Sequence, residues 1–325
     1  MFGPPARVRS RHAFVFIILL LALLALPRIR PARAASDLPE GVVAIGDVHG
    51  DFDDFVSILQ HERLIDAAHH WTGGKTTLVQ VGDLLDRGPK PREVLDLLMA
   101  LEKEAPKAGG RVVSLMGNHE AMNIMGDLRY VTPTNYASFT DSDSEKRQKA
   151  AFQEYVKWRN KHSQLLAELP QPMELTEAEW MARHPAGFVE HREAFSANGV
   201  YGKWLREHSA IAKIEGVAFL HGGLSPALES KKLDAINSQI HDEIKQFDAD
   251  KQYMLEEKLI LPFFNLQEIT AVVQAEIIAE RKGRVNGDNK GQEKLLKFLK
   301  FPEWLSVRVD GPLWFRGTSG PKKRA

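Results

Sequence analysis

Apolar and polar positions repeat the same order three times in the first third of the chain. Short apolar, β-branched runs occupy residues 41–45, 76–81 and 111–116. Helical periodicity follows the first run at residues 52–64, and it follows the second from Pro91 onward, with apolar residues three and four positions apart. Repeated strand–helix units predict a mostly parallel α/β arrangement.

Two later stretches have a different pattern. Residues 130–200 are polar, rich in charge and helical in periodicity, which predicts a helical insertion or cap. Residues 231–299 are again amphipathic and charged, with a break rich in glycine and asparagine at residues 283–291. The α/β units and these helical stretches together fit one domain over residues 36–325.

Two short apolar segments later in the chain predict further strands. Residues 211–220 contain two apolar runs around Glu215 and Gly216, which predicts a β-hairpin with its turn at those two residues. Residues 312–315 are also apolar, and we predict that another strand begins there.

Residues 1–35 have the pattern of an export signal. A basic start precedes an apolar run at residues 13–26, which is shorter than the roughly 20 residues that span a bilayer. Small residues at 32–35 resemble a peptidase site. We predict a signal peptide, with an uncleaved signal anchor as the alternative. Both place residues 36–325 outside the cytoplasm, in the periplasm or medium, with any membrane contact made only by the anchor.

Charge and cysteine content narrow the possible functions. The whole chain has 43 basic and 43 acidic residues, but the first 35 residues contain six arginines and no acid. The remainder therefore has 43 − 6 = 37 basic against 43 acidic residues, a balance that argues against broad nucleic-acid binding. Cysteine is absent, so any bound metal must be held by oxygen and imidazole nitrogen.

Polar clusters follow the apolar runs. A single Gly-Asp pair after a strand is usually only a turn. Here four clusters contain metal-type ligands, and the carboxyl ends of parallel strands meet at one edge of a sheet, where ligands collect. We therefore expect one shared site. The clusters are GDVHG at 46–50, GDLLDRG at 82–88, GNHE at 117–120 and HGGLSP at 221–226.

These four motifs, in this order and spacing, resemble the signatures of the phosphoprotein phosphatases among the calcineurin-like metallophosphoesterases. The segments GVYGKWLREHSAIAKIEGVAFLHGGLSP and DGPLWFRG are most similar to the Shewanella-like phosphatase branch. The resemblance covers roughly residues 41–317. It implies a metallophosphoesterase-type layered β-sheet core flanked by helices.

The resemblance also implies a set of metal ligands. Asp47 and His49 would bind a first divalent ion, and Asp83 would bridge it to a second. Asn118 and His221 would be ligands of the second ion. Carboxylate, amide and imidazole donors suit Mn, Fe or Zn.

Other residues correspond to catalytic and phosphate-binding positions of the family. His119 would be the general acid that protonates the leaving oxygen, and Asp86 would orient it. Arg87, Asn118 and Arg316 would bind the substrate phosphate. A guanidinium group suits this role because it holds phosphate oxygens bidentately.

The implied activity is metal-dependent hydrolysis of phosphate monoesters by a hydroxide that bridges the two ions. The branch includes enzymes acting on phosphotyrosine, so the expected partners are phosphorylated small molecules or phosphoproteins. Such a phosphoric monoester hydrolase needs no cysteine nucleophile.

One departure from the family pattern leaves an alternative open. The family's second metal takes another histidine from a late segment, often Gly-His-Thr, after the arginine that Arg316 resembles. After His221 this sequence contains only His241, in a charged helical pattern, which we predict to be a solvated surface residue. We therefore expect truncated C-terminal strands and weak binding of the second metal. A degenerate, weakly active metal- and phosphate-binding relative is the alternative function.

Overall fold

The computed structural model describes residues 41–169, 174–283 and 289–317, all within the compact unit Pro39–Ala325. The predicted leader and most of the break at 283–291 lie outside the described residues. The boundary between leader and domain thus stays a prediction. In the part of the chain that is described, no helix is long and apolar enough to cross a membrane.

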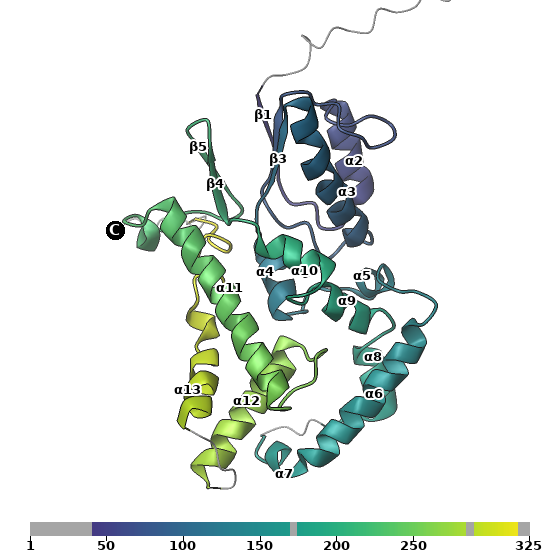
Figure 1. Cartoon of the computed structure of the whole chain (residues 1–325), viewed down its shortest axis with the longest axis vertical. Helices are drawn as coiled ribbons and strands as arrows, with labels where there is room; N and C mark the ends of the chain where they lie inside the picture. Colours follow the sequence, from purple (N-terminus) through teal and green to yellow (C-terminus); the bar gives the residue numbers. More distant parts are fainter. Residues whose placement is uncertain (1–40, 170–173, 284–288, 318–325) are drawn as a thin grey trace, which may run out of the picture. The chain divides into compact units, whose positions relative to one another are not determined.

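The first three strands form a parallel sheet in the order β1-β2-β3. Ile45 pairs with Gln80, which in turn pairs with Ser114, so the three strands end level with one another. The loops that carry the predicted ligands therefore leave the sheet at one edge (Figure 1). This confirms the predicted parallel arrangement, although each strand is shorter than its apolar run. The strands are β1 (Val42–Ile45), β2 (Thr77–Gln80) and β3 (Arg111–Ser114).

Helices α2 (Phe52–His61) and α3 (Pro91–Glu104) follow the first two strands, as predicted. The Asp51 side chain accepts a hydrogen bond from the backbone of Asp54 and so caps α2. Pro91 stands in the first turn of α3, where its missing N–H costs nothing. Both helices bury their apolar faces in the main hydrophobic core.

The described part of the stretch 130–200 is mostly helical, with short turns and loops between the helices. Most of its aromatic side chains are buried in the main core, among them Trp180 and Phe188, whereas Tyr130 is exposed. The helices of this stretch, with the following α10, are α5 (Pro133–Ala137), α6 (Ser144–Lys161), α7 (Ser163–Leu166), α8 (Glu177–Arg183), α9 (Phe188–Ala194) and α10 (Val200–Arg206).

The predicted hairpin is confirmed as the antiparallel pair β4 (Ile211–Ile214) and β5 (Val217–Leu220). Its turn residues Glu215 and Gly216 both have positive φ, as a tight hairpin turn requires. Ile214 packs with Val79 of β2 in a small second core, so the hairpin covers one face of the parallel sheet. A parallel sheet, a second β layer and flanking helices agree with the expected fold class.

The remaining helices include α4, which begins at the predicted GNHE motif. The late helices α11, α12 and α13 make up most of the described part of the polar stretch 231–299 (Figure 1). The remaining elements are α4 (Asn118–Met125), α11 (Leu233–Glu256), α12 (Leu266–Arg281), α13 (Asn289–Phe298) and the 3-10 turns η2 (Ala105–Ala108), η3 (Pro226–Leu228) and η4 (Phe301–Glu303).

The predicted strand at residues 312–315 is wrong, because this segment is a turn. The backbone N–H groups of Trp314 and Phe315 both donate to the carbonyl of Gly311, which curls the chain. The carbonyl of Pro312 accepts from the N–H of Gly222. The segment thus packs against the loop after β5 through a single backbone bond instead of a ladder.

Candidate active site

The loops after β1 and β2 have an unusual backbone. Four of their residues have left-handed φ angles: His49 (48°), Asp83 (58°), Asp86 (68°) and Arg87 (63°). Such conformations are costly for residues with side chains and persist where the surrounding structure enforces them. All four are predicted site residues. The strain therefore coincides with the predicted chemistry.

Two glycines allow these loops to approach one another. A Cβ atom on Gly88 would collide with the backbone carbonyl of His49, and one on Gly117 would collide with the carboxylate of Asp83. Any side chain at either position would separate the loops. The glycines of the GDLLDRG and GNHE motifs thus bring the polar side chains to one point.

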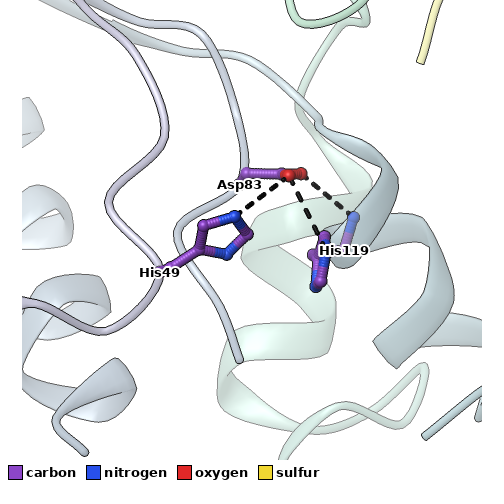
Figure 2. Close-up of side chains that lie close together, drawn as sticks. All are labelled: His49, Asp83 and His119. Carbon is purple, nitrogen blue, oxygen red and sulfur yellow. Dashed lines mark hydrogen bonds and ion pairs between the residues drawn. The ribbon is translucent and has the colours of Figure 1, made fainter. Parts of the chain in front are cut away.

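The carboxylate of Asp83 lies between several imidazole rings. Figure 2 shows it beside His49 and His119, and the Nε2 atom of His49 is 3.6 Å from Asp83 Oδ2. The other nitrogen of His49, Nδ1, lies 2.8 Å from the carbonyl oxygen of Leu85. Because a carbonyl can only accept, Nδ1 donates, and Nε2 is the ring nitrogen that faces the carboxylate.

His221 approaches Asp83 from the loop after β5. Its Nε2 atom is 3.3 Å from Asp83 Oδ2 and 2.9 Å from Asn118 Oδ1. Asp47 stands between the two rings, with its oxygens 3.6 Å from His221 Nδ1 and 3.7 Å from His49 Nε2. The structure therefore brings all five predicted metal ligands together.

The donor set fits divalent cations. His49 Nε2 and His221 Nδ1 are buried and have no hydrogen-bond partner among the residues that the structure describes, which is rare for polar atoms and costly without a ligand. The candidate ligand atoms form two groups, and both groups contain Asp83. Within each group, all ligand atoms lie within 4.8 Å of one another. One group has His49 and His119, the other Asp47 and His221. Oxygen and imidazole donors around a shared carboxylate suit a pair of ions.

His119 has the surroundings that the predicted proton donor requires. Its Nδ1 atom is 2.6 Å from Asp86 Oδ2, and the side chain of Asn123 donates to the same carboxylate. Burial lowers the pKa of His119, but the hydrogen bond to Asp86 and the charge of Asp83 more than offset it, so the pKa is raised. The charged imidazolium is therefore favoured.

The predicted phosphate ligands lie beside these rings. Arg87 Nη2 is 3.4 Å from His119 Nε2. Arg316 Nη2 is 2.8 Å from His221 Nε2 and 3.3 Å from Asn118 Oδ1. Both guanidinium groups therefore border the carboxylate and imidazole cluster, as sequence reasoning expected for phosphate-binding residues.

Glu120 is a site residue whose role sequence reasoning missed. It is fully buried, and its carboxylate accepts three backbone N–H bonds of 2.8 Å from Asp83, Leu84 and Gly117. Burial, and then the charge of Asp83, raise the pKa of Glu120 to about 7. Glu120 thereby fastens the β2 loop to the β3 loop. Its place in the GNHE motif was the available signal.

His241 does not belong to either ligand group. The prediction that it is solvated is wrong, because its ring is half-buried and its Nε2 lies 2.8 Å from the carbonyl oxygen of His208. The ring fixes the end of α10 to α11 rather than facing solvent or the site. Helical charge pattern alone gave no sign of this contact.

Comparison with known proteins identifies the class. The family model described as calcineurin-like phosphoesterase matches residues 41–305, so the chain belongs to that family. Its curated relatives include Shewanella-like protein phosphatases, and the resemblance expected from the motifs is confirmed.

Three relatives illustrate the extent of the similarity. The chain is 35% identical over 223 residues to Shewanella-like protein phosphatase 2 of Arabidopsis thaliana, covering 66% of this chain and 54% of the relative. It is 28% identical over 219 residues to Shewanella-like protein phosphatase 1 of Plasmodium berghei, covering 66% and 49%. A solved cold-active protein tyrosine phosphatase is 26% identical, with a TM-score of 0.50, covering 88% of this chain and 60% of that one. The chain thus spans about half the length of these curated relatives.

Proposed function

We propose that this protein is a metal-dependent phosphatase that hydrolyses phosphate monoesters, including phosphotyrosine-type phosphoproteins. One observation carries the proposal: the buried carboxylate of Asp83 faces the Nε2 atoms of both His49 and His221, at 3.6 and 3.3 Å. Membership in the calcineurin-like phosphoesterase family supports it.

The proposed metal ligands form two sets that share Asp83. Asp47 and His49 would hold the first divalent ion, and Asn118 and His221 the second. Bound ions of Mn, Fe or Zn supply an activated water and neutralise charge on the phosphate. The buried Nε2 atom of His49, which forms no hydrogen bond with any described residue, supports the assignment of His49.

The remaining side chains bind the substrate phosphate and protonate the leaving oxygen. Arg87 and Arg316 hold the phosphate oxygens, because a guanidinium keeps its charge and donates along two directions. As the P–O ester bond breaks, the leaving oxygen takes the proton from Nε2 of His119. Asp86 keeps that ring oriented through its 2.6 Å contact with Nδ1.

Metal dependence and phosphatase activity are tested together. The purified protein is stripped of metal with a chelator and assayed with p-nitrophenyl phosphate before and after Mn, Fe or Zn is added. We expect no turnover without metal and recovery on its return. Full turnover in metal-free protein, or none with any of the three metals, contradicts the proposal.

A second candidate function is metal and phosphate binding with little turnover. Arg316 supports it, because its guanidinium contacts both His221 and Asn118, the protein ligands proposed for the second ion besides the shared Asp83. In that case calorimetry would detect manganese and inorganic phosphate binding in a protein that leaves p-nitrophenyl phosphate intact.

We also propose that residues 1–35 direct export and that residues 36–325 form one phosphatase domain in the periplasm or medium. The arginine-flanked apolar run supports this. Sequencing of the mature protein from its host should give an N-terminus near Ala35 or Ser36. Recovery of Met1 in a membrane fraction would favour an anchor instead.

A further inference from the structure

We propose that Tyr130 determines substrate specificity, with its ring forming a platform for the aromatic leaving group of an aryl phosphate. The proposal rests on the phosphatase function above, which it deepens by naming the residue that favours an aryl ester. Tyr130 lies in the short turn between α4 and α5. It belongs to none of the four sequence motifs.

The ring of Tyr130 borders the groups that would handle the leaving oxygen. Its centroid is 5.1 Å from that of the His119 ring, with an angle of 35° between the planes. The guanidinium carbon of Arg87 lies 6.0 Å from the Tyr130 centroid. We infer that a leaving oxygen within hydrogen-bond reach of His119 can carry its attached carbon group close to the Tyr130 ring.

Tyr130 is the exposed member of this group. It is 42% exposed, whereas the His119 side chain is 1% exposed. Among the described residues none forms a hydrogen bond with the Tyr130 hydroxyl. The ring thus presents an uncovered aromatic surface at the edge of the site, which is costly in water unless something covers it.

The backbone around Tyr130 is held in place on both sides. Before it, Arg129 pairs with Asp127 through its Nε at 2.9 Å. After it, the side chain of Asn135 accepts from the backbone of Thr132 at 2.8 Å and donates to the carbonyl of Gly88 in the Arg87 loop. The platform is therefore pre-organised relative to the phosphate-binding loop, so little ordering cost accompanies stacking.

An aromatic leaving group benefits from this surface and an aliphatic one does not. Two aromatic rings in offset contact gain energy beyond the area that they bury. A phosphoserine side chain has only one methylene beside its oxygen and cannot cover the ring. Tyr130 therefore discriminates in favour of aryl esters without touching the phosphate.

The test compares ligands that cannot be hydrolysed. Affinities for phenylphosphonate and methylphosphonate are measured by calorimetry with manganese present, for the unaltered protein, Tyr130→Phe and Tyr130→Leu. We expect phenylphosphonate to bind about 3- to 10-fold better in the unaltered protein, as one aromatic contact allows. Tyr130→Phe should keep this preference, and Tyr130→Leu should lose most of it.

Hydrolysis of matched phosphotyrosine and phosphoserine peptides gives the second measurement. The ratio of their kcat/KM values should fall in Tyr130→Leu by the same factor as the phosphonate preference. A change in both peptides by an equal factor, or an unaltered phosphonate ratio, overturns the proposal and leaves Tyr130 as a support for His119. An intact phosphonate preference without turnover contradicts the phosphatase function and leaves the platform standing.

Discussion

Two of the histidine rings that face Asp83 are held in different ways. His49 lies in a strained loop of the parallel sheet, with its Nδ1 fixed 2.8 Å from the carbonyl of Leu85, and its Nε2 forms no hydrogen bond with any described residue. His221 follows the hairpin, and its Nε2 contacts Asn118 and the guanidinium of Arg316, while its buried Nδ1 likewise lacks a hydrogen bond within the described part of the chain. We call these the His49 side and the His221 side of the site.

The difference follows from the elements that carry each ring. The His49 side is built from loops of one sheet, which Glu120 and two close glycine contacts join. The His221 side combines the loop after β5 with the turn at residues 311–315, which meet through one backbone bond. We therefore expect the His49 side to bind an ion directly, whereas on the His221 side an ion would first displace Arg316. A metal titration should show two steps, the tighter one on the His49 side.

The largest expected effect is at the residue that both sides share. Asp83→Asn removes a ligand from both ions, so we expect hydrolysis to fall on the order of 10⁴-fold or more and bound metal to fall with it. Activity assays and metal analysis give the result. Asp53→Asn, an exposed acid paired with Lys90, is the control and should change neither. Normal metal content in the Asp83 variant would refute the shared-ligand arrangement.

A smaller loss is expected at the proton donor of the His49 side. His119→Asn should slow hydrolysis of an alkyl phosphate by about 10²–10⁴-fold. The loss should be much smaller for p-nitrophenyl phosphate, whose leaving oxygen hardly needs a proton. The comparison of the two rates separates proton donation from metal binding. Equal losses, together with loss of bound metal, would make His119 a ligand of His49's ion instead.

Glu120→Gln tests how the His49 side is pre-organised. An amide offers one acceptor oxygen where the carboxylate offers two, so part of the anchor of the β2 and β3 loops is lost. We expect metal affinity to fall about 10- to 100-fold, measured by calorimetry. Glu102→Gln is the matched control, because Glu102 also accepts two hydrogen bonds, from Ser114 and Trp204, but away from the site. Similar losses in both variants would assign the effect to general stability.

The smallest effect is expected on the His221 side. Arg316→Gln removes a charged donor that competes with an ion for His221 Nε2, so the weaker metal step should tighten about tenfold. The stronger step should not move. Calorimetric titration without phosphate measures both. If the stronger step shifts instead, or if only one step exists, the contrast between the two sides is wrong.

The motifs were sufficient to predict the family and to predict that their polar residues lie close together. Each ligand cluster follows an apolar run, and parallel strands bring their carboxyl ends together, so local pattern implied a shared site for Asp47, Asp83 and Asn118. The strand–helix periodicity likewise predicted β1 to β3 and helices α2 and α3. These features depend on neighbours in the chain, which is why the sequence reveals them.

Sequence pattern failed where the decisive partners are distant. Residues 312–315 have the composition of a strand, but the carbonyl of Gly311 closes a turn, and the backbone bond to the hairpin side is the one that Pro312 accepts from Gly222. His241 belongs to a charged helix, yet its ring reaches the carbonyl of His208. Local periodicity cannot distinguish these outcomes, because each is decided by one contact across the fold.

The order of the residues was enough to show which ligand types follow which strands, and hence the class of the protein. How each ring is held depends on the folded chain, because the carbonyl of Leu85 orients His49 within a left-handed loop and Arg316 contacts His221 from a segment 95 residues later. Folding also places the Tyr130 ring beside His119. The contacts of these side chains depend on the distances between loops, and packing of the whole fold sets those distances. A motif specifies only the order of its residues.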